Sequence, residues 1–244
     1  MLKTLETVLK DEYSIESEIY PEPVEEWSRH NLLANAIQFP FAFLFELQIR
    51  IMTSLFKQRS KHHKKKITIF ERSLHTAKNV FQSLYFDNAS ITSSEVETLN
   101  SLYDTFMKEK PHLDKSTNII YINLSPKECL DRVQKRINEN QSSNIESDRG
   151  ITEDYLQKLD KKYKEVMNTY NNKKLLILDG SLDPLTLAQH AASFLLKTSS
   201  LSKPTTGMVL KCAKKNHIES KSDDVELEQK KTEHTENNIK DELV

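Results

Sequence analysis

Short β-rich runs alternate with longer helical patterns along most of this chain, and this order restricts the fold class. Three runs have the length and residue types of strands, at residues 67–70, 118–124 and 175–178. A fourth, short extended segment is expected at residues 17–21. Strands that alternate with helices are typical of a parallel sheet covered by helices, so the pattern predicts an α/β fold.

Helical periodicity fills the intervals between these runs. Ser125 followed by Pro126 is a helix start signal directly after the second β-rich run. The predicted helices span residues 2–9, 31–56, 76–85, 93–107, 126–138, 152–170 and 184–196. The second of them is mostly apolar and is expected to bend or start near Pro40, because proline disrupts a helix interior.

Composition limits the classes of partner. The net charge of −1 favours neither nucleic-acid nor membrane partners, and no apolar run approaches the roughly 20 residues that span a bilayer. Cys129 and Cys212 suit a reducing compartment and predict neither a disulfide nor a metal site.

After residue 198 charged and polar residues dominate, so we expect one folded domain at 1–198 and a disordered charged tail at 199–244.

Two charged strings stand out within the folded part. Glu22-Pro23-Val24-Glu25-Glu26-Trp27 is an acidic cluster that ends in tryptophan, and Glu71-Arg72-Ser73 closes the first strong strand candidate. In this order and spacing the strings resemble the deoxynucleoside kinase family, and the likeness extends from about Leu2 to Leu196. The resemblance implies a P-loop NTPase-like fold of three layers with a parallel sheet.

The resemblance also implies roles for the charged residues. Glu22 would be the base at the 5′-hydroxyl of a nucleoside, Arg72 would steady Glu22 and the transferring phosphate, and Glu71 would help to hold Mg²⁺. Trp27 would form a wall of the nucleoside pocket. The alternatives are a solvated acidic surface, an ordinary ion pair at the end of a strand, and a tryptophan that belongs to the core.

Recognition of the base is implied for a second group of residues. Phe81 would stack on the base, although a core role is an alternative, and Ala77 resembles the thymidine and broad-specificity members of the family. The family reads the base with a glutamine directly after a Phe-x-Phe string, whereas here Glu46 follows that string. Gln48 is nearby but would require a shift. A carboxylate accepts hydrogen bonds but cannot donate one, so Glu46 would lose half of the paired amide contact.

Arg132, Lys135 and Arg136 lie at helical spacing beside the polar loop at 140–150. They resemble the basic lid helix that closes over the phosphates of ATP, where cations stabilise spread negative charge. The alternative is a plain solvated helix face. The family places a glutamate pair in the lid to contact the sugar 3′-hydroxyl, and Glu139 is the candidate for that role here, although it is out of register.

Glycine is scarce, which matters because this family holds ATP in a Gly-x-x-x-x-Gly-Lys-Ser/Thr loop. The three glycines are Gly150, Gly180 and Gly207, and none precedes the two strings. We therefore expect the first strand and the P-loop to be absent from this chain, which would leave a gap inside the sheet.

The sequence predicts a deoxynucleoside kinase of nucleotide salvage. It would use Mg²⁺ and transfer the γ-phosphate of ATP to the 5′-hydroxyl of a deoxynucleoside, with thymidine or another pyrimidine favoured. The cytoplasm or the mitochondrion would be its compartment, and a homodimer is an open alternative to the monomer. A catalytically inactive kinase-like subunit or binding protein is the second hypothesis. The nucleoside monophosphate kinases share the fold but lack the two strings.

Overall fold

A computed structural model describes residues 1–111, 113, 118–139, 148–170 and 174–199. Contacts between residues divide the chain into two units, Met1–Pro204 and Thr205–Val244. The predicted tail at 199–244 lies outside the described residues except for Ser199.

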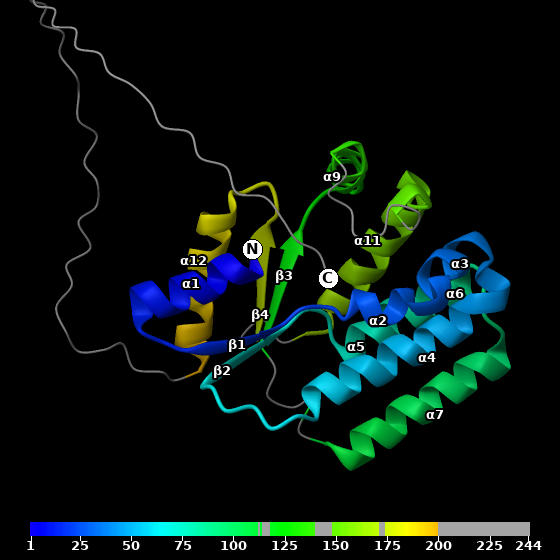
Figure 1. The fold of residues 1–244 in the computed structure, drawn as a ribbon, viewed down its shortest axis with the longest axis horizontal. Coiled ribbons are helices and arrows are strands. Elements are labelled where there is room, and N and C mark those ends of the chain that lie inside the picture. Colours follow the sequence, from blue (N-terminus) through cyan, green and yellow to red (C-terminus); the bar gives the residue numbers. More distant parts are fainter. Residues whose placement is uncertain (112, 114–117, 140–147, 171–173, 200–244) are drawn as a thin grey trace, which may run out of the picture. The chain divides into compact units, whose positions relative to one another are not determined.

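The strands form two parallel pairs (Figure 1). Strand β1 (Ser17–Tyr20) pairs with β2 (Ile67–Phe70), and β3 (Ile119–Asn123) pairs with β4 (Leu175–Asp179). Each pair joins strands that are separated by helices in the sequence, as a parallel crossover requires. The structure therefore confirms the predicted α/β class with parallel strands.

Helices make up most of the remaining described chain. Before β2 they are α1 (Leu2–Tyr13), α2 (Val24–Ser28), the 3₁₀ turn η1 (Arg29–Asn31), α3 (Leu32–Gln38) and α4 (Pro40–Arg59). Between β2 and β3 they are α5 (Leu74–Thr76), the π-helical segment η2 (Ala77–Gln82), α6 (Ser83–Asp87) and α7 (Ser93–Glu109). Later come α9 (Pro126–Asn138), α11 (Glu153–Met167) and α12 (Pro184–Thr198).

The long helix expected at 31–56 is divided in two at Phe39. Phe39 has φ −129° and ψ 67°, outside the helical region, and Pro40 is the first residue of α4. Proline disfavours helical backbone in the residue before it and is well suited to the first helical turn. The chain therefore ends α3 and starts α4 at this point.

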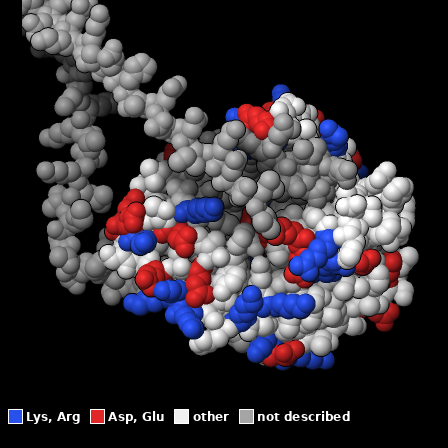
Figure 2. All heavy atoms as spheres, viewed as in Figure 1, with Lys and Arg blue, Asp and Glu red and all other residues white. Residues whose placement is uncertain are grey.

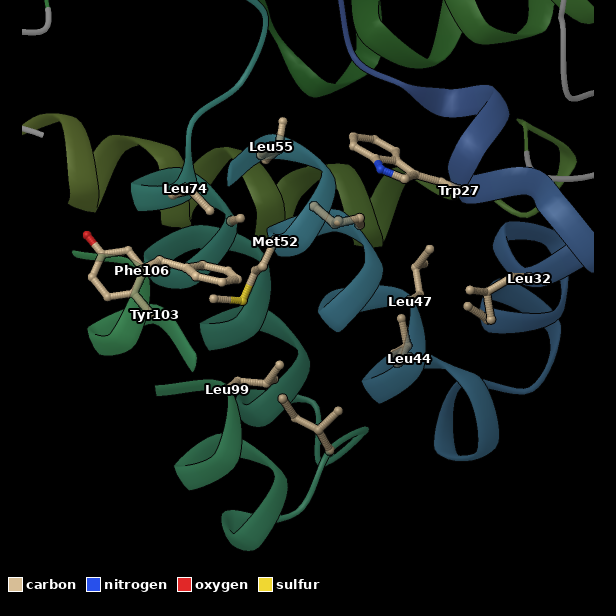
Figure 3. Packing of buried hydrophobic residues seen from close by; sticks show 14 residues of the cluster. Trp27, Leu32, Leu44, Leu47, Met52, Leu55, Leu74, Leu99, Tyr103 and Phe106 are labelled. Carbon is tan, nitrogen blue, oxygen red and sulfur yellow. The ribbon is translucent and has the colours of Figure 1, made fainter. Parts of the chain in front are cut away.

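The described residues form three apolar cores, and the smallest of them, around Val80 and Phe81, packs against β3 and β4. Helices α1 and α12 pack together through fully buried residues, and the small side chains of Ala188, Ala191 and Ala192 allow a close approach. The second core surrounds α4 and includes Trp27, Met52 and Leu99, with α7 on one side (Figure 3). Because Trp27 follows β1, this second core fixes the position of the segment that carries the acidic cluster.

A cavity of about 440 Å³ lies between the two strand pairs. Phe70 of β2 and Ile119, Ile120 and Ile122 of β3 line it, and among the described strands β2 and β3 are not hydrogen-bonded to each other. Among the described strands, the sheet is therefore interrupted between β2 and β3.

On the face drawn in Figure 2, basic and acidic side chains lie next to one another. Within the described ranges, no helix is both long and apolar enough to cross a membrane.

Candidate active site

Two charged segments meet where β1 and β2 end. Glu22 follows β1 by two residues, and Glu71 and Arg72 directly follow β2. Because the strands are parallel, their carboxyl ends lie at the same edge, where open α/β sheets place their sites. The backbone N–H of Glu71 donates to the Tyr20 carbonyl at 2.9 Å, and the N–H of Glu22 donates to Glu71 Oε2 at 3.1 Å.

Glu22 and Arg72 form a close ion pair between Oε1 and Nε. Both side chains are largely buried, with exposed fractions of 19% for Glu22 and 18% for Arg72. Burial raises the pKa of Glu22, the Arg72 guanidinium opposes that rise, and Glu71 adds to it. A carboxyl group with a raised pKa, held beside a fixed cation, is suited to accept a proton.

The Arg72 guanidinium lies against two aromatic rings. Its central carbon is 4.0 Å from the centre of the Phe81 ring and 5.3 Å from that of the Trp27 ring. The indole Nε1 of Trp27 donates to Ser54 Oγ at 2.8 Å, which fixes the ring. The structure thus brings together Trp27, Phe81, Arg72 and Glu22, which the sequence places as far as 59 residues apart (Glu22 to Phe81).

Ala77 and Gln48 adjoin this group on the side of α4. Ala77 is fully buried, and its carbonyl accepts a hydrogen bond of 2.6 Å from Gln48 Nε2. Gln48 is also fully buried, and its Oε1 has no hydrogen-bond partner among the described residues. A buried acceptor of this kind is a candidate to bind a ligand donor.

Glu46 is placed differently from the expectation. Its side chain is 56% exposed and pairs with Arg50 at 3.0 Å along the outside of α4. Residues two apart on a helix differ by about 200° in direction, so Glu46 and Gln48 face opposite sides. Glu46, which was expected to contact the base, therefore lies on the outer face of α4, and Gln48 lies on the inward face.

Three tyrosines that sequence analysis did not single out lie close to the ion pair. Burial raises the pKa of Tyr85, Tyr155 and Tyr163, that of Tyr163 to about 12, and the Arg72 charge opposes the rise in each. Tyr85 and Tyr155 share a hydrogen bond, and the Tyr163 ring meets Phe81 edge-on at 6.0 Å. Tyrosine at helical spacing is typical of any core, so the sequence held no distinctive signal for them.

The predicted lid residues lie on α9 and are engaged with other parts of the protein. Arg132 Nη2 donates to the Gly180 carbonyl at 2.7 Å, beside the end of β4. Arg136 makes a two-point contact with Asp148, from Nε at 3.3 Å and Nη2 at 3.2 Å. Lys135 is 72% exposed and pairs with Glu139 one turn along the helix.

Glu139, the candidate for the sugar 3′-hydroxyl, lies at the C-terminal end of α9 and pairs with the exposed Lys135. Asp148 is 16% exposed and contacts Arg136 just before α11, the helix that carries Tyr155. The segment 140–147 between them lies outside the described residues.

The residues present fit a bound Mg²⁺ only in part. Within the described ranges, no group of three or more His, Cys, Asp or Glu side chains could hold a metal ion. Mg²⁺ beside nucleotide phosphates needs one or two carboxylates, with phosphate oxygens and water as the other ligands. Glu71, which adjoins Glu22, fits as one such carboxylate.

The parallel strands, with an acid–arginine pair at their carboxyl ends, define an α/β protein with a candidate site at the sheet edge where this class of fold binds ligands. A model of the family described as deoxynucleoside kinase matches residues 3–200, and the chain belongs to this family. This confirms the resemblance drawn from the two strings.

Two curated relatives have names that point the same way. The chain is 28% identical over 163 residues to "Putative kinase protein 143R" of Invertebrate iridescent virus 6, a match that covers 66% of this chain and 75% of the viral protein. It is 24% identical over 180 residues to "Deoxycytidine kinase 2" of Gallus gallus, with 64% and 65% covered. The matched part of the chain thus spans 75% of the length of the viral relative and 65% of that of the avian one.

Proposed function

We propose that this chain carries the nucleoside-phosphorylating site of a deoxynucleoside kinase. The observation that carries the proposal is the buried Glu22–Arg72 pair, adjoined by Glu71 at the carboxyl ends of two parallel strands. In the proposed reaction Glu22 accepts the proton of the 5′-hydroxyl, the oxygen bonds to the γ-phosphorus of ATP, and ADP leaves. Arg72 stabilises the negative charge that develops on the transferred group.

ATP and Mg²⁺ are the cofactors that this family implies. We assign Glu71 to the metal, which would neutralise phosphate charge when bound. Arg132 and Arg136 are the lid cations in this proposal, and Lys135 contributes positive charge at the exposed face of α9. The Arg136 guanidinium binds the Asp148 carboxylate in the structure. Arg136 would therefore have to release Asp148 in order to bind a phosphate.

The base would lie beside Trp27 and Phe81, with Gln48 at its edge. Gln48 Nε2 is already bonded to Ala77, so its buried Oε1 is the atom left to accept from a base N–H. Thymine offers such a donor at N3, and the small Ala77 side chain also supports a pyrimidine such as thymidine. Nucleotide salvage in the cytoplasm or the mitochondrion is the setting that this activity fits.

Ligand-dependent thermal unfolding tests this proposal without any requirement for turnover. We expect thymidine, with or without Mg-ATP, to raise the melting temperature of the protein. A ligand at 100 times its Kd stabilises by about 2.7 kcal/mol. No stabilisation by any deoxynucleoside would favour the inactive kinase-like subunit.

A further inference from the structure

Arg59 is a buried arginine with no role in the chemistry described above. It is the last residue of α4 and is 8% exposed. Its guanidinium carbon lies 4.4 Å from the centre of the Phe70 ring, at the end of β2. Its Nη2 donates to the backbone carbonyl of Arg72 at 2.9 Å.

Arg72, whose carbonyl accepts the hydrogen bond from Arg59, has an unusual backbone conformation. Arg72 has φ 66°, in the left-handed region that residues with a side chain rarely adopt. Such conformations persist only where surrounding contacts hold them, and they concentrate at functional sites. Arg72 is held at its carbonyl by Arg59 and at its guanidinium by Glu22.

We propose that Arg59 is a positioning residue that holds the Arg72 backbone in its left-handed conformation and so directs the Arg72 guanidinium onto Glu22. The planar fork of arginine suits this task, because it can lie flat on Phe70 while one of its N–H groups reaches the carbonyl. Arg59 thus connects the C-terminal end of α4 to the turn that follows β2. The proposal rests on the proposed function only in treating Glu22 as the base.

Arg59→Lys tests the proposal, because it keeps the charge and removes the fork. The matched control is Arg50→Lys in the same helix, where the arginine pairs with Glu46 on the outside. Two readouts by nuclear magnetic resonance on the full chain need no catalysis. They are the titration of the Glu22 carboxyl carbon, assigned with Glu22→Gln, and solvent exchange of the Arg72 Nε–H.

The groups that face Glu22 are Arg72, Glu71, Tyr85 and Tyr163. Of these, Arg72 is the one that favours ionised Glu22, so its displacement should move the Glu22 titration to higher pH. We expect this upward shift in Arg59→Lys, together with faster exchange of the Arg72 Nε–H. Arg50→Lys should match the parent in both readouts.

A second variant, Arg59→Met, removes the donor altogether and should shift the Glu22 titration in the same direction. Near-ultraviolet circular dichroism would establish that each variant is folded. If folded Arg59 variants leave the Glu22 titration and the Arg72 exchange unchanged, the proposal is overturned. An equal shift in Arg50→Lys would overturn it as well.

In an active enzyme we also expect the kcat of the Arg59 variants to fall by about 10- to 100-fold while KM changes little.

Discussion

Gln48 in the middle of α4 donates its side-chain amide to the carbonyl of Ala77, at 2.6 Å, in the segment that follows Glu71-Arg72-Ser73. This bond connects α4 to the start of η2, five residues after Arg72. The amide nitrogen Nε2 is thus bonded, whereas the buried oxygen Oε1 has no hydrogen-bond partner among the described residues.

We expect Gln48→Met to weaken deoxynucleoside binding by about fivefold, since one buried hydrogen bond contributes on the order of 1 kcal/mol. Isothermal titration calorimetry would measure the affinity. Glu46→Gln is the matched control, because Glu46 is exposed on the opposite side of the same helix. A larger loss in Glu46→Gln than in Gln48→Met would contradict the placement of Gln48 at the base.

The hydrogen bond from Trp27 to Ser54 gives a prediction about stability. Ser54 is 2% exposed, so Ser54→Ala would leave the indole N–H buried without its acceptor. The free energy of unfolding should fall by about 1–3 kcal/mol. Urea unfolding followed by Trp27 fluorescence would measure it. Thr53→Ala is the control, because the Thr53 hydroxyl donates to the Ile49 carbonyl of its own helix, and loss of this bond should cost less.

The raised pKa of Glu22 gives a pH dependence whose sign is fixed. Between the ordinary value of 4.5 and the higher folded value, the folded state binds more protons than the unfolded state. The contribution of Glu22 to stability is therefore present at low pH and is lost as pH rises through the folded pKa. The free energy of unfolding of Glu22→Gln minus that of the parent should therefore be larger at pH 7.5 than at pH 4.5. Urea unfolding at both values would measure this, and a relative loss would contradict the assignment.

Residues 199–244 are proposed to be dispensable for folding. The last described helix, α12, ends at Thr198, and its buried residues lie between Leu187 and Leu196. Deletion of 199–244 should leave thermal unfolding cooperative, whereas deletion of 184–244 should abolish cooperativity, because it removes α12 from the core around Leu5 and Leu9. Loss of cooperativity in the shorter deletion would refute the proposed domain boundary.

Much of the fold could be predicted from local sequence. The β-rich runs at 67–70, 118–124 and 175–178 lie within one residue of β2, β3 and β4, because strand residue types and flanking polar residues are local signals. The break at Phe39 was foreseen only as a bend or start near Pro40. Its exact form depends on packing around α3 and α4, which local sequence does not encode.

The part of the site that lies in the two short motifs was predictable. Glu22 follows β1, and Glu71 and Arg72 follow β2, so the parallel pairing of these strands places the three residues at one edge of the sheet. Gln48 was not preferred over Glu46 because the choice depends on which face of α4 is buried. Tyr155 and Asp148 could not be found for a similar reason, since their neighbours come from distant segments.

Glu22 is proposed to be the base of a nucleoside-phosphorylating site. The most direct measurement is transfer of labelled γ-phosphate from ATP to thymidine by the native protein, Glu22→Gln and Glu25→Gln, with thymidine affinity measured in parallel. We predict that Glu22→Gln lowers turnover by about 10²- to 10⁴-fold with nearly unchanged affinity, as loss of a general base requires, and that the exposed Glu25 is replaceable. Equal turnover in Glu22→Gln and the native protein would contradict the claim.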